Sequence, residues 1–225
     1  MDELISLEWP STDIAVITLN RPDKKNALSI AMRDAVSGAL DELRDSETLK
    51  CVVLTGAGTA FSAGFDLLEF QAAASDPELR KRLWTSSDRY HKALLMFPLP
   101  IVAAVNGTAL GGGMDTAVLS DIRIAADTAR FGHPEAAFGD VVYAPLHDLV
   151  GGAAARNLCL TGRVVDSQEA LRLGLVSEVV PAVRLTDRSL AIARDIAKGP
   201  REVLLRTKAK FIARASIEFR TTLEL

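Results

Sequence analysis

The sequence predicts an α/β fold, and three observations support this prediction. A short apolar run that passes through a glycine-rich turn into a helix occurs twice, at residues 51–70 and at residues 101–120. From about residue 185 onward the chain reads as two helices separated by Gly199-Pro200. With 48% hydrophobic residues among 225, the chain can bury the core of one large domain.

The first segments read as a hairpin followed by a helix. Leu4–Trp9 and Ile14–Asn20 alternate well enough to be paired strands, with polar turn residues between them. Pro22 would end the second strand, and Ser29 is a suitable N-cap for a helix over residues 29–44.

The next segments repeat this order of strand, turn and helix. Cys51–Thr55 reads as a strand, and a helix begins within FSAGFDLLEF after the glycine turn. Asp76-Pro77 begins an amphipathic helix that ends before Pro98. Three large apolar residues near it can pack in the core or wall an acyl pocket: Trp84, Met96 and Phe97.

The stretch from Ile101 to Ser120 carries the clearest functional pattern. Five apolar residues lead through Asn106-Gly107 into three glycines and a helix. Glycines at the start of a helix leave backbone N–H groups uncovered, and the helix dipole adds partial positive charge there. An oxyanion can bind at such a place, although the glycines can equally serve close packing of the strand and the helix.

In both segments a helix begins after a glycine-rich turn, and we call each of these helix starts an opening. In each opening a small residue stands three positions before an aspartate. Ala63 precedes Asp66, and Gly112 precedes Asp115. Two such openings can direct two N–H donors at one oxygen.

The remaining chain alternates short elements. Ile122–Ala126 reads as a strand and Arg130–Glu135 as a tight turn, in which Pro134 fixes the direction of Glu135. The segments that follow read as helix, helix, strand, helix and helix in this order: Arg156–Leu160, Ser167–Leu173, Leu175–Val180, Leu185–Lys198 and Arg201–Ala215.

Four segments, LNRPDKKNALS, FSAGFDL, AAVNGTALGGGMD and FGHPE, occur in this order. Their separations resemble those of the enoyl-CoA hydratase/isomerase family, the crotonases, over about Leu4–Lys210. The resemblance implies a crotonase-like fold of repeated ββα units that form a spiral core over residues 1–180. A helical C-terminal region over residues 181–225 is expected to be shorter than is usual in the family. The resemblance also implies a homotrimer or a hexamer built as a dimer of trimers.

The resemblance implies roles for individual residues as well. The backbone N–H groups of Ala63 and Gly112 would stabilise the enolate of a CoA thioester, and Glu135 and Asp115 would be the two acids. Hydratases generally carry glutamate where this chain has Asp115, which is shorter by one methylene. The residues expected to bind CoA are Lys24, Lys25, Ala27, Ala63, Gly64, Phe65, Asp66 and Gly112.

The expected activity is hydration of an enoyl-CoA, and two alternatives stay open. A Δ3,Δ2-enoyl-CoA isomerase needs only Glu135, and an acyl-CoA-binding homologue needs neither acid. An aryl-CoA dehalogenase would require an aspartate near position 143 and a histidine near position 88, where Tyr143 and Asp88 stand. A ClpP-like protease would require a serine, histidine and aspartate set in a matching motif, and the sequence has none.

Hydratases also carry a glycine-rich run where this chain has residues 142–149, so the pocket wall that these residues form must differ from that of the hydratases.

Composition limits the classes of binding partner and the expected cellular location. A net charge of −3 and a pI near 5.7 argue against a nucleic-acid binder. No signal peptide and no apolar run of about 20 residues is visible, so we expect a cytoplasmic protein with no membrane partner. Cys51 and Cys159 are expected to be buried, and no metal or redox cofactor is expected beyond the CoA of the substrate. His91 and the pair His147 and Asp148 are expected at the surface.

Overall fold

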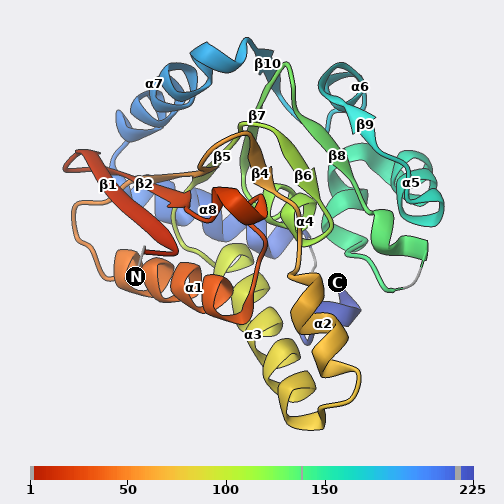
Figure 1. Cartoon of the computed structure of the whole chain (residues 1–225). Helices are drawn as coiled ribbons and strands as arrows, with labels where there is room; N and C mark the ends of the chain where they lie inside the picture. The colour runs from red at the N-terminus through yellow and green to blue at the C-terminus, as the bar shows by residue number, and fades with distance from the viewer. Residues whose placement is uncertain (1–2, 138, 216–218) are drawn as a thin grey trace.

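The computed structural model describes residues 3–137, 139–215 and 219–225. Within these ranges the strands form two sheets, which Figure 1 shows at the centre of the molecule. The larger sheet has the order β1-β2-β3-β5-β7-β10. Its strands are β1 (Ile5–Ser11), β2 (Ile14–Leu19), β3 (Cys51–Gly56), β5 (Ile101–Val105), β7 (Ile122–Ala126) and β10 (Glu178–Val180). The smaller sheet contains β4 (Ala60–Ser62), β6 (Thr108–Leu110), β8 (Arg130–Gly132) and β9 (Val165–Asp166) in this order.

The chain repeats one supersecondary unit. In each of the pairs β3-β4, β5-β6 and β7-β8, the first strand joins the larger sheet and the second joins the smaller sheet. A helix follows each pair: α2 (Leu67–Ala73), α4 (Gly112–Val118) and the 3₁₀ helix η2 (Pro134–Ala137). This arrangement confirms the predicted α/β fold of repeated ββα units.

The central strands of the larger sheet are parallel and buried. β3 pairs in parallel with β2 and with β5, and β5 pairs in parallel with β7. Parallel sheets bury both faces, so their strands read as continuous apolar runs rather than as alternating patterns. All five residues of β5 are buried, as the run IVAAV predicts.

Helices cover both faces of this sheet (Figure 1). On one face lie α1 (Ile30–Arg44) and α3 (Pro77–Leu95), and on the other α7 (Leu185–Ala197) packs its buried face against residues of β3, β5 and β7. Local caps explain where the first two helices begin. The Ser29 side chain accepts a hydrogen bond from the Met32 N–H, and the Asp76 side chain accepts from the Glu78 and Leu79 N–H groups.

The structure describes several further helices. They are η1 (Pro22–Lys24), α5 (Ala144–Thr161), α6 (Ser167–Arg172), η3 (Ala182–Arg184), α8 (Arg201–Ala215) and η4 (Thr222–Glu224). α7 and α8 confirm the two closing helices that the sequence predicts. No helix in the described part of the chain is long and apolar enough to cross a membrane.

Several segments differ from the sequence prediction, among them Thr108–Leu110, which forms strand β6 where the sequence predicts a turn. Arg130–Gly132 forms strand β8 instead of a turn, because it pairs with β6 on one side and with β9 on the other. The predicted helix Arg156–Leu160 is the end of the longer α5, which is interrupted by positive φ at Gly151. The predicted last strand is confined to β10, since only its three residues pair with β7.

The prediction of a surface position for His91 is wrong. The side chain is fully buried, and its Nδ1 lies 3.0 Å from Oγ1 of Thr222. Burial lowers the pKa of His91 to about 3, so the imidazole is neutral near pH 7. The partner lies far along the sequence, where no local pattern around His91 could indicate it.

The predictions for the His147 and Asp148 pair and for the two cysteines are confirmed. His147 and Asp148 form an exposed pair 3.5 Å apart, and both cysteines are free and buried. Phe97 is fully buried in the main core, whereas Trp84 is half-buried against the small cluster of Ile30, Ala73 and Leu83.

Candidate active site

The start of α4 lies directly beside the carboxylate of Glu135. Gly111 precedes the helix with a φ of 51°, a conformation that favours glycine. A Cβ atom on Gly111 would stand 2.9 and 3.0 Å from the two carboxylate oxygens of Glu135. A side chain at this position would therefore displace the carboxylate. Gly112 is the first residue of α4, so its N–H has no acceptor within the helix.

The second opening contributes a different N–H group from the one predicted. The Ala63 N–H donates to the backbone carbonyl of Lys25 at 2.9 Å, and the Gly64 N–H donates to the Ser62 hydroxyl at 3.1 Å. Ala63 is therefore not a free donor in this structure. The Phe65 N–H meets no acceptor among the described residues, which makes it the open donor of this turn.

The two aspartates that suggested equivalent openings hold different positions. Asp66 is the N-cap of α2, where its carboxylate accepts from the Leu68 N–H, whereas Asp115 lies inside the first turn of α4. Asp66 also forms an ion pair with Arg21 at 2.8 Å. Counting back three residues from each aspartate therefore does not give equivalent backbone positions.

The two openings touch each other. A Cβ atom on Gly112 would lie 2.6 Å from two ring carbons of Phe65, and a Cβ atom on Gly64 would lie 3.3 Å from the Gly112 nitrogen. The Phe65 ring is held from other sides by the Arg33 guanidinium, 4.4 Å from the ring centroid, and by the His91 ring, which stacks at 6.0 Å. The uncovered N–H groups of Phe65 and Gly112 thus belong to turns in contact.

A buried histidine connects the two predicted acids. His133 is fully buried, its Nδ1 lies 3.0 Å from Oε1 of Glu135, and its Nε2 lies 3.5 Å from Oδ1 of Asp115. The longer distance is an ionic contact without a good hydrogen bond, so both of these atoms lack a hydrogen-bond partner within the described chain. The side chain of Asp115 is 9% exposed and that of Glu135 is 23% exposed.

Burial and charge explain how these groups titrate. Burial raises the pKa of Asp115 to about 7, although His133 lowers it and Glu135 raises it further. Burial alone would lower the pKa of His133, but the charges of Asp115 and Glu135 and the hydrogen bond to Glu135 raise it above its ordinary value. Near pH 7 the pair of Asp115 and His133 therefore holds a proton that an isolated aspartate would have lost.

The loop that carries the predicted CoA-binding lysines borders this site. Lys24 and Lys25 are exposed, and the Lys25 carbonyl is the group that engages Ala63. The loop is anchored by Asn26, a buried side chain that donates to the carbonyls of Ala57 and Ala60. Ala27 follows in the same loop, with its carbonyl 3.5 Å from the Arg21 guanidinium. Both lysine side chains are therefore placed on a loop whose backbone is fixed to the site.

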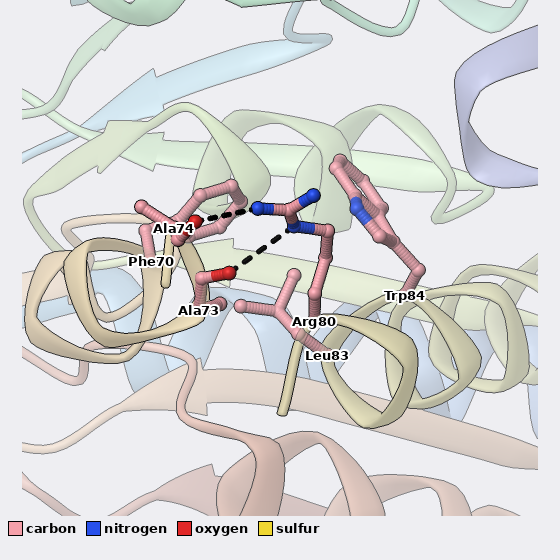
Figure 2. A pocket seen from close by; sticks show the side chains of 6 residues that line it. All are labelled: Phe70, Ala73, Ala74, Arg80, Leu83 and Trp84. Carbon is pink, nitrogen blue, oxygen red and sulfur yellow. Dashed lines mark hydrogen bonds between the residues drawn. The ribbon is translucent and has the colours of Figure 1, made fainter. Parts of the chain in front are cut away.

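An apolar cavity of about 240 Å³ lies between α2 and α3. Figure 2 shows its lining, in which the Phe70 and Trp84 rings meet edge to face, with their centroids 5.9 Å apart. The Arg80 guanidinium donates to the carbonyls of Ala73 and Ala74. Phe70 connects the cavity to the site, since its ring centroid is 5.7 Å from that of Phe65.

Comparison with known proteins shows the family of this chain. Residues 10–225 fit the model of the enoyl-CoA hydratase/isomerase family. The chain belongs to this family. It is 34% identical over 205 residues to a hydroxycinnamoyl-CoA hydratase-lyase from Pseudomonas fluorescens, covering 88% of this chain and 74% of that protein.

Solved structures of enoyl-CoA hydratases share the fold. The enzyme from Bacillus anthracis superposes with a TM-score of 0.89 at 30% identity, covering 96% of this chain and 85% of that one. The enzyme from Mycobacterium tuberculosis superposes with a TM-score of 0.81 at 30% identity, covering 94% and 90%. The predicted family and the crotonase fold are confirmed.

Two parts of this candidate site are not predicted from the sequence. The Phe65 N–H was missed because its freedom depends on which neighbours the Lys25 carbonyl and the Ser62 hydroxyl engage. His133 was missed as a site residue, although its place two residues before Glu135 was a usable signal. The described residues contain no group of three or more histidine, cysteine or acidic side chains suited to a metal ion.

Proposed function

We propose that this protein is an enoyl-CoA hydratase that adds water across the 2,3 double bond of an acyl-CoA thioester. The observation that carries the proposal is the carboxylate of Glu135 at the start of α4, beside two touching turns with uncovered N–H groups. A thioester needs both features, because its α-proton becomes acidic only when negative charge on the thioester oxygen is stabilised.

The oxyanion hole consists of the backbone N–H groups of Phe65 and Gly112. When water adds to the β-carbon of an enoyl thioester, charge develops on the thioester oxygen, and two preorganised donors stabilise it without reorganisation. The loss of one such donor typically costs about 3 kcal/mol of barrier. Gly112 is the donor that the sequence predicts, and Phe65 takes the place predicted for Ala63.

Proton transfer falls to Glu135 and Asp115. In the direction of hydration, the ionised carboxylate takes a proton from the water that adds to the β-carbon, and the protonated carboxyl group delivers a proton to the α-carbon. The raised pKa of Asp115, about 7, supports a protonated acid beside the more exposed Glu135. His133 contacts both acids, so Asp115 and Glu135 belong to one buried cluster.

The CoA moiety binds along the loop of Lys24, Lys25 and Ala27 and along the turn of Ala63, Gly64, Phe65 and Asp66. Exposed lysines suit the phosphates of CoA, although the Asp66 carboxylate is already engaged by Arg21 and by the Leu68 N–H. The acyl group runs towards the cavity beside Phe70 and Trp84, which is apolar and joined to the site by the Phe65 ring. No further cofactor takes part in this reaction.

A Δ3,Δ2-enoyl-CoA isomerase is the second candidate. Its reaction moves a proton from the α-carbon to the γ-carbon and needs one acid beside the oxyanion hole. The observation in its favour is the burial of Asp115, whose side chain is much less exposed than that of Glu135. An acid that cannot reach the substrate would leave Glu135 to act alone.

Turnover of two substrates separates these functions. Purified protein and its Asp115→Asn variant are assayed with crotonyl-CoA for hydration and with a 3-enoyl-CoA for isomerisation. Hydration by the wild type that falls by about 100-fold or more in the variant supports the hydratase. Isomerisation in both proteins without hydration would favour the isomerase, and tight acyl-CoA binding without turnover would leave a binding role. The assembly as a homotrimer or hexamer stays a prediction, which sedimentation of the same sample tests.

A further inference from the structure

In the cluster of Asp115, His133 and Glu135, a histidine lies between the two acids. Its three members come from separate elements: α4, the segment after β8, and η2. The backbone of His133 is fixed, since its carbonyl accepts from the Ala136 N–H at 3.0 Å and Gly162 packs against it. The imidazole is fully buried and lies between the two carboxylates.

Hydrogen-bond chemistry determines which nitrogen carries the proton. A carboxylate accepts, so the Nδ1 that lies 3.0 Å from Glu135 Oε1 is the donor. In neutral His133 the Nε2 then carries a lone pair 3.5 Å from Oδ1 of Asp115. No hydrogen bond joins these two atoms, and the contact is less repulsive when Asp115 holds a proton than when it is ionised. If the histidine is charged, the same proton sits on Nε2 and Asp115 is ionised.

We propose that His133 is a positioning residue that fixes Glu135 through its Nδ1 and holds its Nε2 in ionic contact with Asp115, so that the charges of the two carboxyl groups depend on each other. This inference rests on the proposed function. It assigns Glu135 as the ionised base and Asp115, or the imidazolium beside it, as the store of the proton. Oε1 of Glu135 is held by His133, which leaves Oε2 to face the substrate.

Other groups near the cluster do not supply this coupling. The charge of Asp115 acts on two further titratable groups, Tyr90 of α3 and Cys159 of α5. Burial raises the pKa of Tyr90 and raises the pKa of Cys159 to about 11, so both are uncharged near pH 7. The charge that His133 experiences in this pH range therefore comes from Asp115 and Glu135.

Nitrogen NMR of ¹⁵N-histidine-labelled protein tests the assignment without turnover. The chain has 3 histidines, so single variants of His91 and His147 identify the signals of His133. The expected spectrum near pH 7 shows His133 protonated at Nδ1, with that signal shifted by Glu135→Gln and the titration midpoint lowered by Asp115→Asn. A His133 protonated only at Nε2, or a titration that neither variant moves, would overturn the proposal. A failure of the proposed function would leave this result unaffected.

Two substitutions of His133 add a kinetic readout. Asparagine keeps an N–H donor near the place of Nδ1, whereas leucine keeps the bulk and loses both nitrogens. We expect His133→Leu to lower kcat by about 100-fold with KM changed less than about 3-fold, and His133→Asn to recover most of that loss. The pH profile of kcat should shift in both variants. Equal kcat for the asparagine and leucine variants, or an unchanged pH profile, would contradict a positioning role.

Discussion

The ring of Phe65 lies so close to Gly112 that a Cβ atom on Gly112 would stand 2.6 Å from two of its carbons. This contact joins the two turns whose N–H groups are uncovered. It also means that the first residue of α4 must be glycine for the turns to keep their spacing. The geometry of the proposed oxyanion hole therefore depends on one missing methyl group.

Gly112→Ala tests this relationship. The added methyl must push the Phe65 ring away, which displaces one donor, and we expect kcat to fall by about 100-fold. The measurement is steady-state kinetics with an enoyl-CoA, alongside the melting temperature. Gly38→Ala is the matched control, because a Cβ there meets nothing within 4 Å in the middle of α1. That control should keep its activity and gain roughly 0.5–1 kcal/mol of stability. Full activity in Gly112→Ala would contradict the proposed donor geometry.

Asp115→Asn should change how stability depends on pH. The folded pKa of Asp115, about 7, lies above its ordinary value of 3.8, so the folded state binds the proton more tightly than the unfolded state. The stability that the protonated acid provides is full near pH 4 and is lost as pH rises through about 7. The raised pKa of His133 acts in the same direction, because its stabilising charge is present below pH 6.5 and is lost at higher pH.

Chemical denaturation from pH 4 to pH 8 measures this dependence. Between these limits the free energy of unfolding of the wild type should fall, relative to Asp115→Asn, by at most about 4 kcal/mol. Parallel curves for the two proteins would show that Asp115 does not titrate as its burial requires.

His91 should have the opposite effect. Its folded pKa of about 3 lies below the ordinary 6.5, so the unfolded state binds a proton that the buried imidazole refuses. The contribution of neutral His91 is present above pH 6.5 and is lost as pH falls towards 3. In His91→Asn this acid-side loss should shrink by at most about 5 kcal/mol. The exposed His147→Asn is the control and should follow the wild type; an acid-side slope that His91→Asn leaves intact would count against this account.

Strong local signals made most of the helices predictable. Ser29 and Asp76 accept hydrogen bonds from the first turns of their helices, and such caps are visible in sequence. The strands β6, β8 and β9 have only two or three residues, and their pairing partners lie far along the chain. Residue patterns within such short segments do not distinguish a strand from a turn.

The candidate site shows the same division. The roles of Gly112, Asp115 and Glu135 were implied by the resemblance to the crotonases, and the structure brings Asp115 and Glu135 together around His133 at the start of α4. In the other turn the Ala63 N–H is engaged by the Lys25 carbonyl, so the free donor is the Phe65 N–H. The hydrogen-bond partner of His91 is Thr222, 131 residues away. Long-range contacts of this kind depend on tertiary packing, which no local pattern encodes.

Trp84→Ala tests the proposed path of the acyl group. Removal of the indole enlarges the cavity beside Phe70, so longer acyl chains should gain relative to crotonyl-CoA. We expect the ratio of kcat/KM for a ten-carbon to a four-carbon enoyl-CoA to rise by about 10-fold. Trp9→Ala, at an exposed position on β1, is the matched control and should leave this ratio unchanged. An unchanged ratio in Trp84→Ala would place the acyl group elsewhere.

The most direct test of the central claim is the kcat of Glu135→Gln with crotonyl-CoA. Glutamine keeps the size of the side chain and removes the proton-transfer group, so kcat should fall by roughly 10²–10⁴-fold with little change in KM. Glu47→Gln makes the same chemical change at an exposed position and should retain full activity. If Glu135→Gln hydrates crotonyl-CoA within about 3-fold of the wild type, Glu135 is not the acid–base group and the proposed mechanism is wrong.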